Sequence, residues 1–126
     1  MSNIQIYDKS QSIRRIEKLG KAGSLYPDLG KILTQHILDV QIRNEVPTQQ
    51  LERIVEFIFK QYPDFSIDDI EEAFFLAITP DNLPCDPRDL QHYGELTPRY
   101  VGNVLSAYRK HRQENRRRER MNQKPF

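Results

Sequence analysis

Apolar residues recur at spacings of three and four along this chain of 126 residues, and prolines separate one such stretch from the next. No segment of useful length alternates between apolar and polar residues, as a half-buried strand would. The pattern therefore predicts an all-α fold, a small bundle of four to five helices. The C-terminus is expected to form either a basic helical extension of the bundle or a disordered tail.

Each apolar stretch is bounded by residues that start or stop helices. Serine or threonine precedes most stretches as a candidate N-cap, while glycine or proline follows them. The helices are expected at residues 10–21, at residues 27–44, from Thr48 to Tyr62, from Ser66 to Ile78, and from Thr97 or Pro98 onward. Acidic residues crowd the start of the fourth helix. We interpret them as stabilising the positive end of the helix dipole, in preference to forming a calcium-binding loop.

The fourth helix is predicted to be the central and most buried one. Its inner face is marked by Ile67, Ile70, Phe74, Ala77 and Ile78, and Phe75 and Leu76 widen that face. On the second helix, His36 falls on the apolar stripe. A hydrogen-bonded core histidine is the favoured interpretation there, ahead of a ligand for a metal.

Residues 79–95 contain three prolines and a glycine, so they are expected to form an ordered surface loop. Leu90, Tyr93 and Leu96 are spaced so that they would pin the loop to the body. Such a loop is either a contact surface or a simple connector, and the sequence leaves both open.

Charge divides the chain into three parts. Residues 1–26 carry a net charge of +3, residues 27–98 carry −9 and residues 99–126 carry +7, although the whole chain carries only +1. We therefore expect an N-terminal segment with a short helix (1–24), a helical core domain (25–108) and a basic C-terminal tail (109–126). Opposite signs on one chain indicate an anionic partner for the basic part.

The basic tail has no apolar residue between Arg109 and Arg120, so it cannot pack against the core. Arginine forks grip phosphates with paired hydrogen bonds, which makes the tail a candidate nucleic-acid contact. The candidate residues are Arg109, Arg112, Arg116, Arg117, Arg118 and Arg120. Three alternatives stay open: a solvated tail, an acidic protein partner, and the chain's own acidic body.

Other chemistry finds little support. Cys85 and His92 share a loop, but they lack the further ligands of a zinc site and the third group of a catalytic triad. We therefore expect no catalytic residues, no metal, no cofactor and no enzymatic activity. No long apolar run predicts a membrane span and no signal peptide is evident, so a cytoplasmic location is expected.

Residues 51 to 112 resemble a group of small phage and mobile-element proteins that share a helix, an acidic-start helix, a loop and a final helix before a basic tail. The matching positions are Asp69, Ile70, Phe74, Ala77, Leu105, Ala107, Tyr108 and Arg112. The resemblance covers about half of the chain. It implies an accessory protein of DNA replication, with some members resembling loaders of the replicative helicase.

Two functions of different class follow. The first is a non-enzymatic, helicase-loader-like adaptor whose body docks a replicative helicase or another protein and whose tail contacts nucleic acid. The second is a structural or regulatory interaction protein, for example a virion component, whose tail binds an acidic protein surface.

Overall fold

The computed structural model describes residues 7–123, and in this part of the chain it contains five α-helices and no strands. The helices are α1 (Ile13–Lys18), α2 (Leu25–Asp39), α3 (Thr48–Gln61), α4 (Ile67–Ala77) and α5 (Pro98–Gln123). Short 3₁₀ turns lie at Ala22–Ser24, Pro80–Asn82 and Pro87–Leu90. The predicted all-α fold is confirmed, and the basic segment forms a helical extension as far as Gln123.

The first two helices are shorter than predicted because the backbone turns left-handed soon after each. Ser12 caps α1 by accepting a hydrogen bond from the Arg15 amide, and Gly20 follows the helix with φ +75°. Gln41 has φ +57° and stands just after the end of α2. Helix α2 starts before Pro27, because a proline in the first turn removes no intrahelical hydrogen bond.

The acidic start of α4 is a capping box. The Ser66 hydroxyl accepts from the Asp69 amide at 3.0 Å, and the Asp69 carboxylate accepts from the Ser66 amide at 2.9 Å. Two backbone donors that the helix leaves unpaired are thereby satisfied. This confirms the helix-start interpretation of these acids over a calcium loop.

The hydrophobic core lies where α2 and α5 pack against α4, with α3 beside both. Leu33, Ile58, Phe74 and Leu105 contribute from the four helices. The predicted core boundary at residue 25 is too late, because Ile13 and Ile16 of α1 are fully buried. The segment carrying α1 is tied to the α3–α4 turn, where the Ile13 amide donates to the Phe65 carbonyl at 2.8 Å.

Helices α3 and α5 approach closely at Gly102. A β-carbon on Gly102 would lie 3.1 Å from Cζ of Phe57, so a larger residue there would push the Phe57 ring aside. The Tyr62 hydroxyl donates to the Gly102 carbonyl at 3.1 Å and lies 2.7 Å from the Ser106 hydroxyl. These contacts help to fix the direction of the α5 axis relative to α3.

Two predictions about side-chain burial are wrong. Phe75 is 70% exposed and Ile78 is also exposed, because the neighbours of α4 cover the faces on either side of Phe75. In the loop, Leu90 and Leu96 are buried as predicted, but Tyr93 is 82% exposed. The Tyr93–Gly94 turn has positive φ at both residues, and the tyrosine side chain is not part of the core.

Candidate nucleic-acid interface

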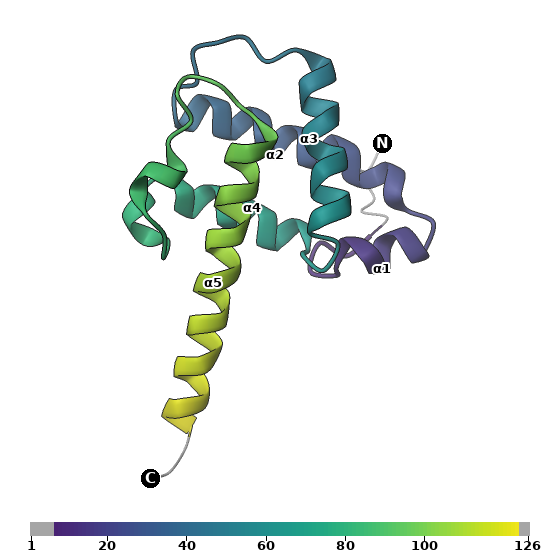
Figure 1. Ribbon diagram of the computed structural model, residues 1–126. Helices are drawn as coiled ribbons and strands as arrows, with labels where there is room; N and C mark the ends of the chain where they lie inside the picture. The colour runs from purple at the N-terminus through teal and green to yellow at the C-terminus, as the bar shows by residue number, and fades with distance from the viewer. Residues whose placement is uncertain (1–6, 124–126) are drawn as a thin grey trace.

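Helix α5 consists of a packed half and a projecting half. The stretch up to Arg112 packs against α3, α4 and the loop turn at Pro87–Leu90, with Val101 and Leu105 fully buried. Beyond it, the helix continues away from all other elements (Figure 1). We call residues 113–123 the arm, and every residue from Gln113 to Asn122 is exposed.

A polar clamp holds α5 where the arm begins. The Tyr108 hydroxyl donates to the Glu72 carboxylate at 2.6 Å and to the Asp69 carboxylate at 3.4 Å. The Arg112 guanidinium donates to the other oxygen of Asp69 at 2.8 Å. Burial, followed by the hydrogen bond to Glu72, raises the pKa of Tyr108, so its hydroxyl stays a donor.

Arg109 is also held by the body. Its guanidinium donates to the Asp64 carboxylate at 3.0 Å and lies over the rings of Tyr62 and Phe65, at 5.3 Å and 5.0 Å from their centres. Arg112 also lies over the Phe65 ring, 4.9 Å from its centre. Both arginines therefore have partners within the chain.

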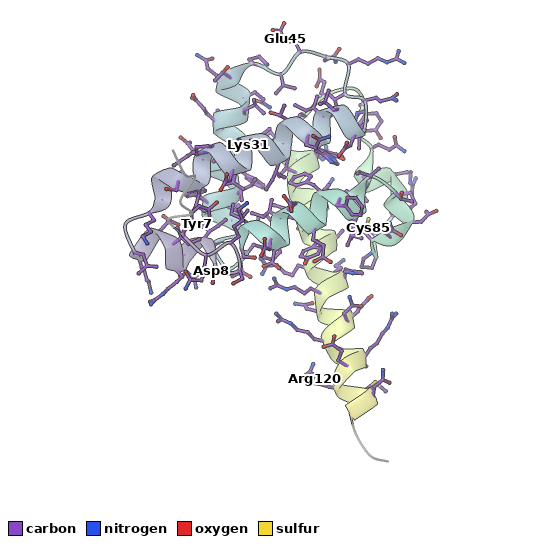
Figure 2. All side chains as sticks on the ribbon, turned by 180° about the vertical axis from the view of Figure 1, so that it is seen from behind. Tyr7, Asp8, Lys31, Glu45, Cys85 and Arg120 are labelled. Carbon is purple, nitrogen blue, oxygen red and sulfur yellow. The ribbon has the colours of Figure 1, made fainter. Side chains whose placement is uncertain are left out.

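The six predicted contact residues thus divide into two groups. Arg109 and Arg112 pair with carboxylates of the body. One of the alternatives predicted this arrangement for the whole basic tail, but only these two of the six residues follow it. Arg116, Arg117, Arg118 and Arg120 lie on the arm and are exposed. Figure 2 shows Arg120 on the projecting end of the helix. Of the six predicted contact residues, only the four on the arm have no partner in the body.

Sequence reasoning did not single out the body residues that hold α5. Asp64 and Asp69 lie 45 and 43 positions before the arginines that they bind. The sequence offered one hint of this contact. Asp69, Tyr108 and Arg112 are all among the positions that carry the resemblance in residues 51 to 112. The structure brings these three residues together as one network.

The loop pair Cys85 and His92 does not form a nucleophile and base. Both nitrogens of His92 are used by backbone groups: Nε2 lies 3.0 Å from the Val40 carbonyl, and Nδ1 accepts from the Gly94 amide at 2.8 Å. Burial, with help from Asp89 and Asp86, raises the pKa of the Cys85 thiol. Within residues 7–123, no three metal-ligating side chains gather at one place.

His36 is a buried core histidine, as predicted. Its Nε2 shares a 2.6 Å hydrogen bond with the Tyr100 hydroxyl, and its ring centre lies 4.8 Å from that of Phe74. Burial lowers the pKa of His36 to about 4 and raises the pKa of Tyr100 to about 12. The pair therefore links α2 to α5 in its neutral form at pH 7.

No helix in the described part of the chain combines the length and the apolar character needed to cross a membrane. Comparison with protein-family models, curated proteins and solved structures gives no match for this chain. Any assignment of function therefore rests on the geometry of the arm and on the resemblance in residues 51 to 112.

Proposed function

We propose that this protein binds nucleic acid through its phosphates, with the arm as the contact, and that it acts as a non-enzymatic adaptor in phage or mobile-element DNA replication. The observation that carries the proposal is the placement of four exposed arginines on the arm, the part of α5 that projects away from the body. Arginine at this density suits phosphate oxygens, because each guanidinium offers a fork of donors.

Helical geometry arranges the arm's arginines in a strip. At about 100° per residue, Arg116 and Arg120 lie about 40° apart around the helix, and Arg117 lies within about 100° of both. Arg118 lies on the other side, four residues after Glu114, which can pair with it. The phosphate contact is therefore assigned to Arg116, Arg117 and Arg120.

The charge of the body also favours the arm as the nucleic-acid contact. Residues 27–98 carry a net charge of −9, so the body repels nucleic acid and leaves the arm as its contact. The arm keeps the helix direction set by the clamp of Asp69, Tyr108 and Arg112. These three residues match the outline of the replication proteins, and that resemblance is what supports the replication role and a helicase as protein partner.

The alternative is a structural or regulatory interaction protein, such as a virion component, whose tail binds an acidic protein surface. The ion pairs of Arg109 and Arg112 with carboxylates favour it, since they show that neighbouring arginines already bind this type of group. Binding to nucleic acid separates the two functions.

The test is fluorescence anisotropy of the full chain with labelled single-stranded DNA, double-stranded DNA and RNA at several salt concentrations. Three contacting arginines predict a log–log salt slope of about −2 for single strands and about −2.7 for a duplex. Arg116→Gln, Arg117→Gln and Arg120→Gln together should abolish binding, while lysine at the same positions should weaken it only in part.

A matched control removes the same charge from the body. Arg14, Arg15 and Lys18 are exposed on α1, and their replacement by glutamine lowers the net charge by the same amount. This control should bind almost as well as the parent. If the parent fails to bind any of the three nucleic acids at about 50 mM salt, where screening is weak, the nucleic-acid proposal is wrong.

A further inference from the structure

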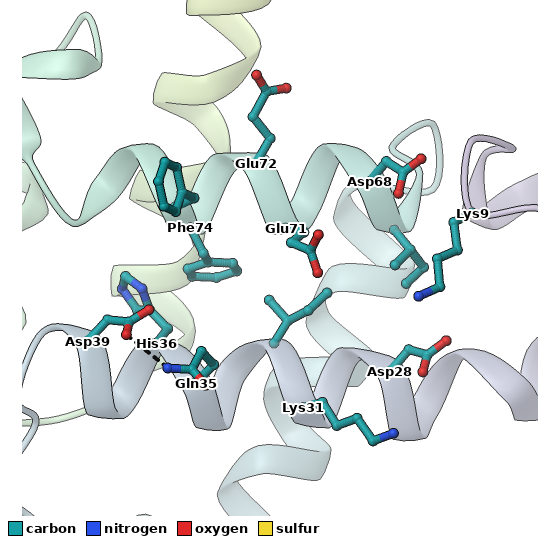
Figure 3. A pocket seen from close by; sticks show the side chains of 13 residues that line it. Lys9, Asp28, Lys31, Gln35, His36, Asp39, Asp68, Glu71, Glu72 and Phe74 are labelled. Atoms are coloured by element: carbon teal, nitrogen blue, oxygen red, sulfur yellow. Dashed lines mark hydrogen bonds between the residues drawn. The ribbon is translucent and has the colours of Figure 1, made fainter.

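A groove of about 720 Å³ runs between α2 and α4 (Figure 3), and no residue of the arm lines it. Ile32, Ile67 and Phe74 supply its apolar lining. Two lysines, Lys9 and Lys31, also line the groove. They are outnumbered by five carboxylates, those of Asp28, Asp39, Asp68, Glu71 and Glu72. The groove is therefore an acidic surface with an apolar floor.

Within residues 7–123, the carboxylates of this groove have no cationic partner, although those of Asp28, Asp39 and Glu72 accept hydrogen bonds from neutral side chains. Among the described residues, none of the five carboxylates has a lysine or arginine within ion-pair distance. Phe75 at the rim is mostly exposed, and Nδ1 of the buried His36 has no hydrogen-bond partner. Carboxylates without cationic partners together with an exposed aromatic ring suit a partner that is cationic and also carries an apolar side chain.

The charge of the groove selects the kind of occupant. Nucleic acid is repelled, while a cationic segment with an apolar side chain is complementary to it. The chain itself carries such a segment, because the arm presents four arginines and an exposed Met121. Methionine sulfur makes favourable contacts with aromatic rings such as that of Phe75.

The dimensions of the two parts also agree. At 1.5 Å per residue, the groove from Asp28 to Asp39 is about 16 Å long and the arm is about 15 Å long. The clamp at Arg112 and Tyr108 directs the arm away from the body that carries it, so the arm does not lie in its own groove.

We propose that the arm of one copy lies in the groove between α2 and α4 of a second copy. The contact joins unlike surfaces, so it either closes on itself or continues from copy to copy. It uses the same arm as the proposed nucleic-acid contact but does not depend on nucleic-acid binding. Nucleic acid and the second copy would compete for the arm.

The first test is analytical ultracentrifugation of the full chain without nucleic acid. Exposed ion pairs are individually weak, so we compare concentrations from about 10 µM to about 1 mM. At about 50 mM salt the average mass should rise from the 15.0 kDa of one chain to at least twice that value. At about 500 mM salt, where screening is strong, it should stay at one chain. A single-chain mass at every concentration in low salt overturns the proposal.

The second test exchanges the charges. The groove variant carries Asp39→Lys and Glu71→Lys, and the arm variant carries Arg116→Glu and Arg117→Glu. Each variant alone should remain a single chain, because its arm and groove now repel each other. An equimolar mixture should associate again, since it pairs the acidic arm with the basic groove and also the unchanged basic arm with the unchanged acidic groove.

A matched control shows whether the groove itself is responsible. Glu52 and Glu56 are exposed on α3 outside the groove, and replacing both with lysine makes the same change in net charge. This control should associate like the parent. If it loses association as the groove variant does, or if the mixed variants stay single, the arm-in-groove contact is wrong. The arm variant changes only exposed residues, so a loss of association in this variant does not result from misfolding.

Discussion

The two halves of α5 differ in what holds them in helical form. The packed half has an apolar stripe, with Val101, Val104 and Leu105 buried against neighbouring helices. The arm has no such stripe and contacts nothing, yet it continues the same helix to Gln123. An isolated helix of about 11 residues would be marginal in water because nucleation is costly. The packed half supplies the nucleus, and arginine, glutamine and glutamate propagate it well.

This comparison separates stability from function within one helix. The packed half binds the body through apolar contacts and through Arg109 and Arg112, which are therefore committed to folding. The arm contributes little to folding, and its arginines are available to partners. Substitutions on either side of the boundary at Arg112 should therefore have different consequences.

The largest expected effect lies in the body. Phe74 is 2% exposed, and Phe74→Ala should lower the free energy of unfolding by about 3–5 kcal/mol. Its neighbour Phe75 is the matched control, because it is exposed and Phe75→Ala should change that free energy by less than about 0.5 kcal/mol. Urea unfolding followed by circular dichroism measures both. Equal losses for the two variants would mean that both faces of α4 are covered.

The next effect depends on pH. Since burial lowers the pKa of His36 to about 4, below its ordinary value of 6.5, the unfolded chain takes up a proton more readily than the folded one. Stability is fully present above pH 6.5 and is lost as the pH falls toward 4. The loss between pH 7 and pH 5 should be about 2 kcal/mol.

The control for the pH effect is His36→Gln, which places a polar amide near Tyr100 in place of the imidazole and does not titrate. Carboxylates also protonate at the acidic end of this range, so the quantity to compare is the difference between parent and variant at each pH. That difference should shrink as the pH falls from 7 to 5. If the two curves stay parallel, His36 titrates normally and is not buried.

The helices and most of the core could be predicted because apolar spacing reports the face that a helix buries. Phe74 and His36 were placed correctly for this reason. The exposure of Phe75 could not be predicted, since it depends on which neighbour covers each face of α4. The same holds for Tyr93, whose outward direction depends on a left-handed turn in the loop.

The candidate site was predicted only in outline. A stretch without apolar residues indicates that the tail leaves the core, and the choice between helix and disorder was left open. The sequence could not show at which residue α5 stops contacting the body. That point depends on the pairs of Arg109 with Asp64 and of Arg112 with Asp69, whose members lie far apart along the chain. The α2–α4 groove was missed entirely, since its carboxylates come from separate helices and from both sides of an apolar floor.

A smaller effect tests the boundary at Arg112 directly. Arg112 and Asp69 are each only 23% exposed in their side chains, so Arg112→Gln should cost about 1 kcal/mol of unfolding free energy. Arg116→Gln makes the same chemical change one turn later and should cost less than about 0.5 kcal/mol. Thermal and urea unfolding of both variants give the comparison. A cost for Arg116→Gln as large as that for Arg112→Gln would place the arm in contact with the body.

A small effect is expected even from the largest change to the chain, deletion of residues 113–126. The described part of this segment buries no apolar side chain and makes no contact with the body, so its removal exposes no core surface. The thermal midpoint should fall by less than about 5 °C, which corresponds to roughly 1 kcal/mol for a domain of this size. Differential scanning calorimetry of the parent and the truncated chain measures the shift. The truncated chain should also keep the pH dependence of His36, because that residue lies wholly within the body. A larger fall in the midpoint would contradict the division of α5, since it would mean that the arm helps to hold the fold together.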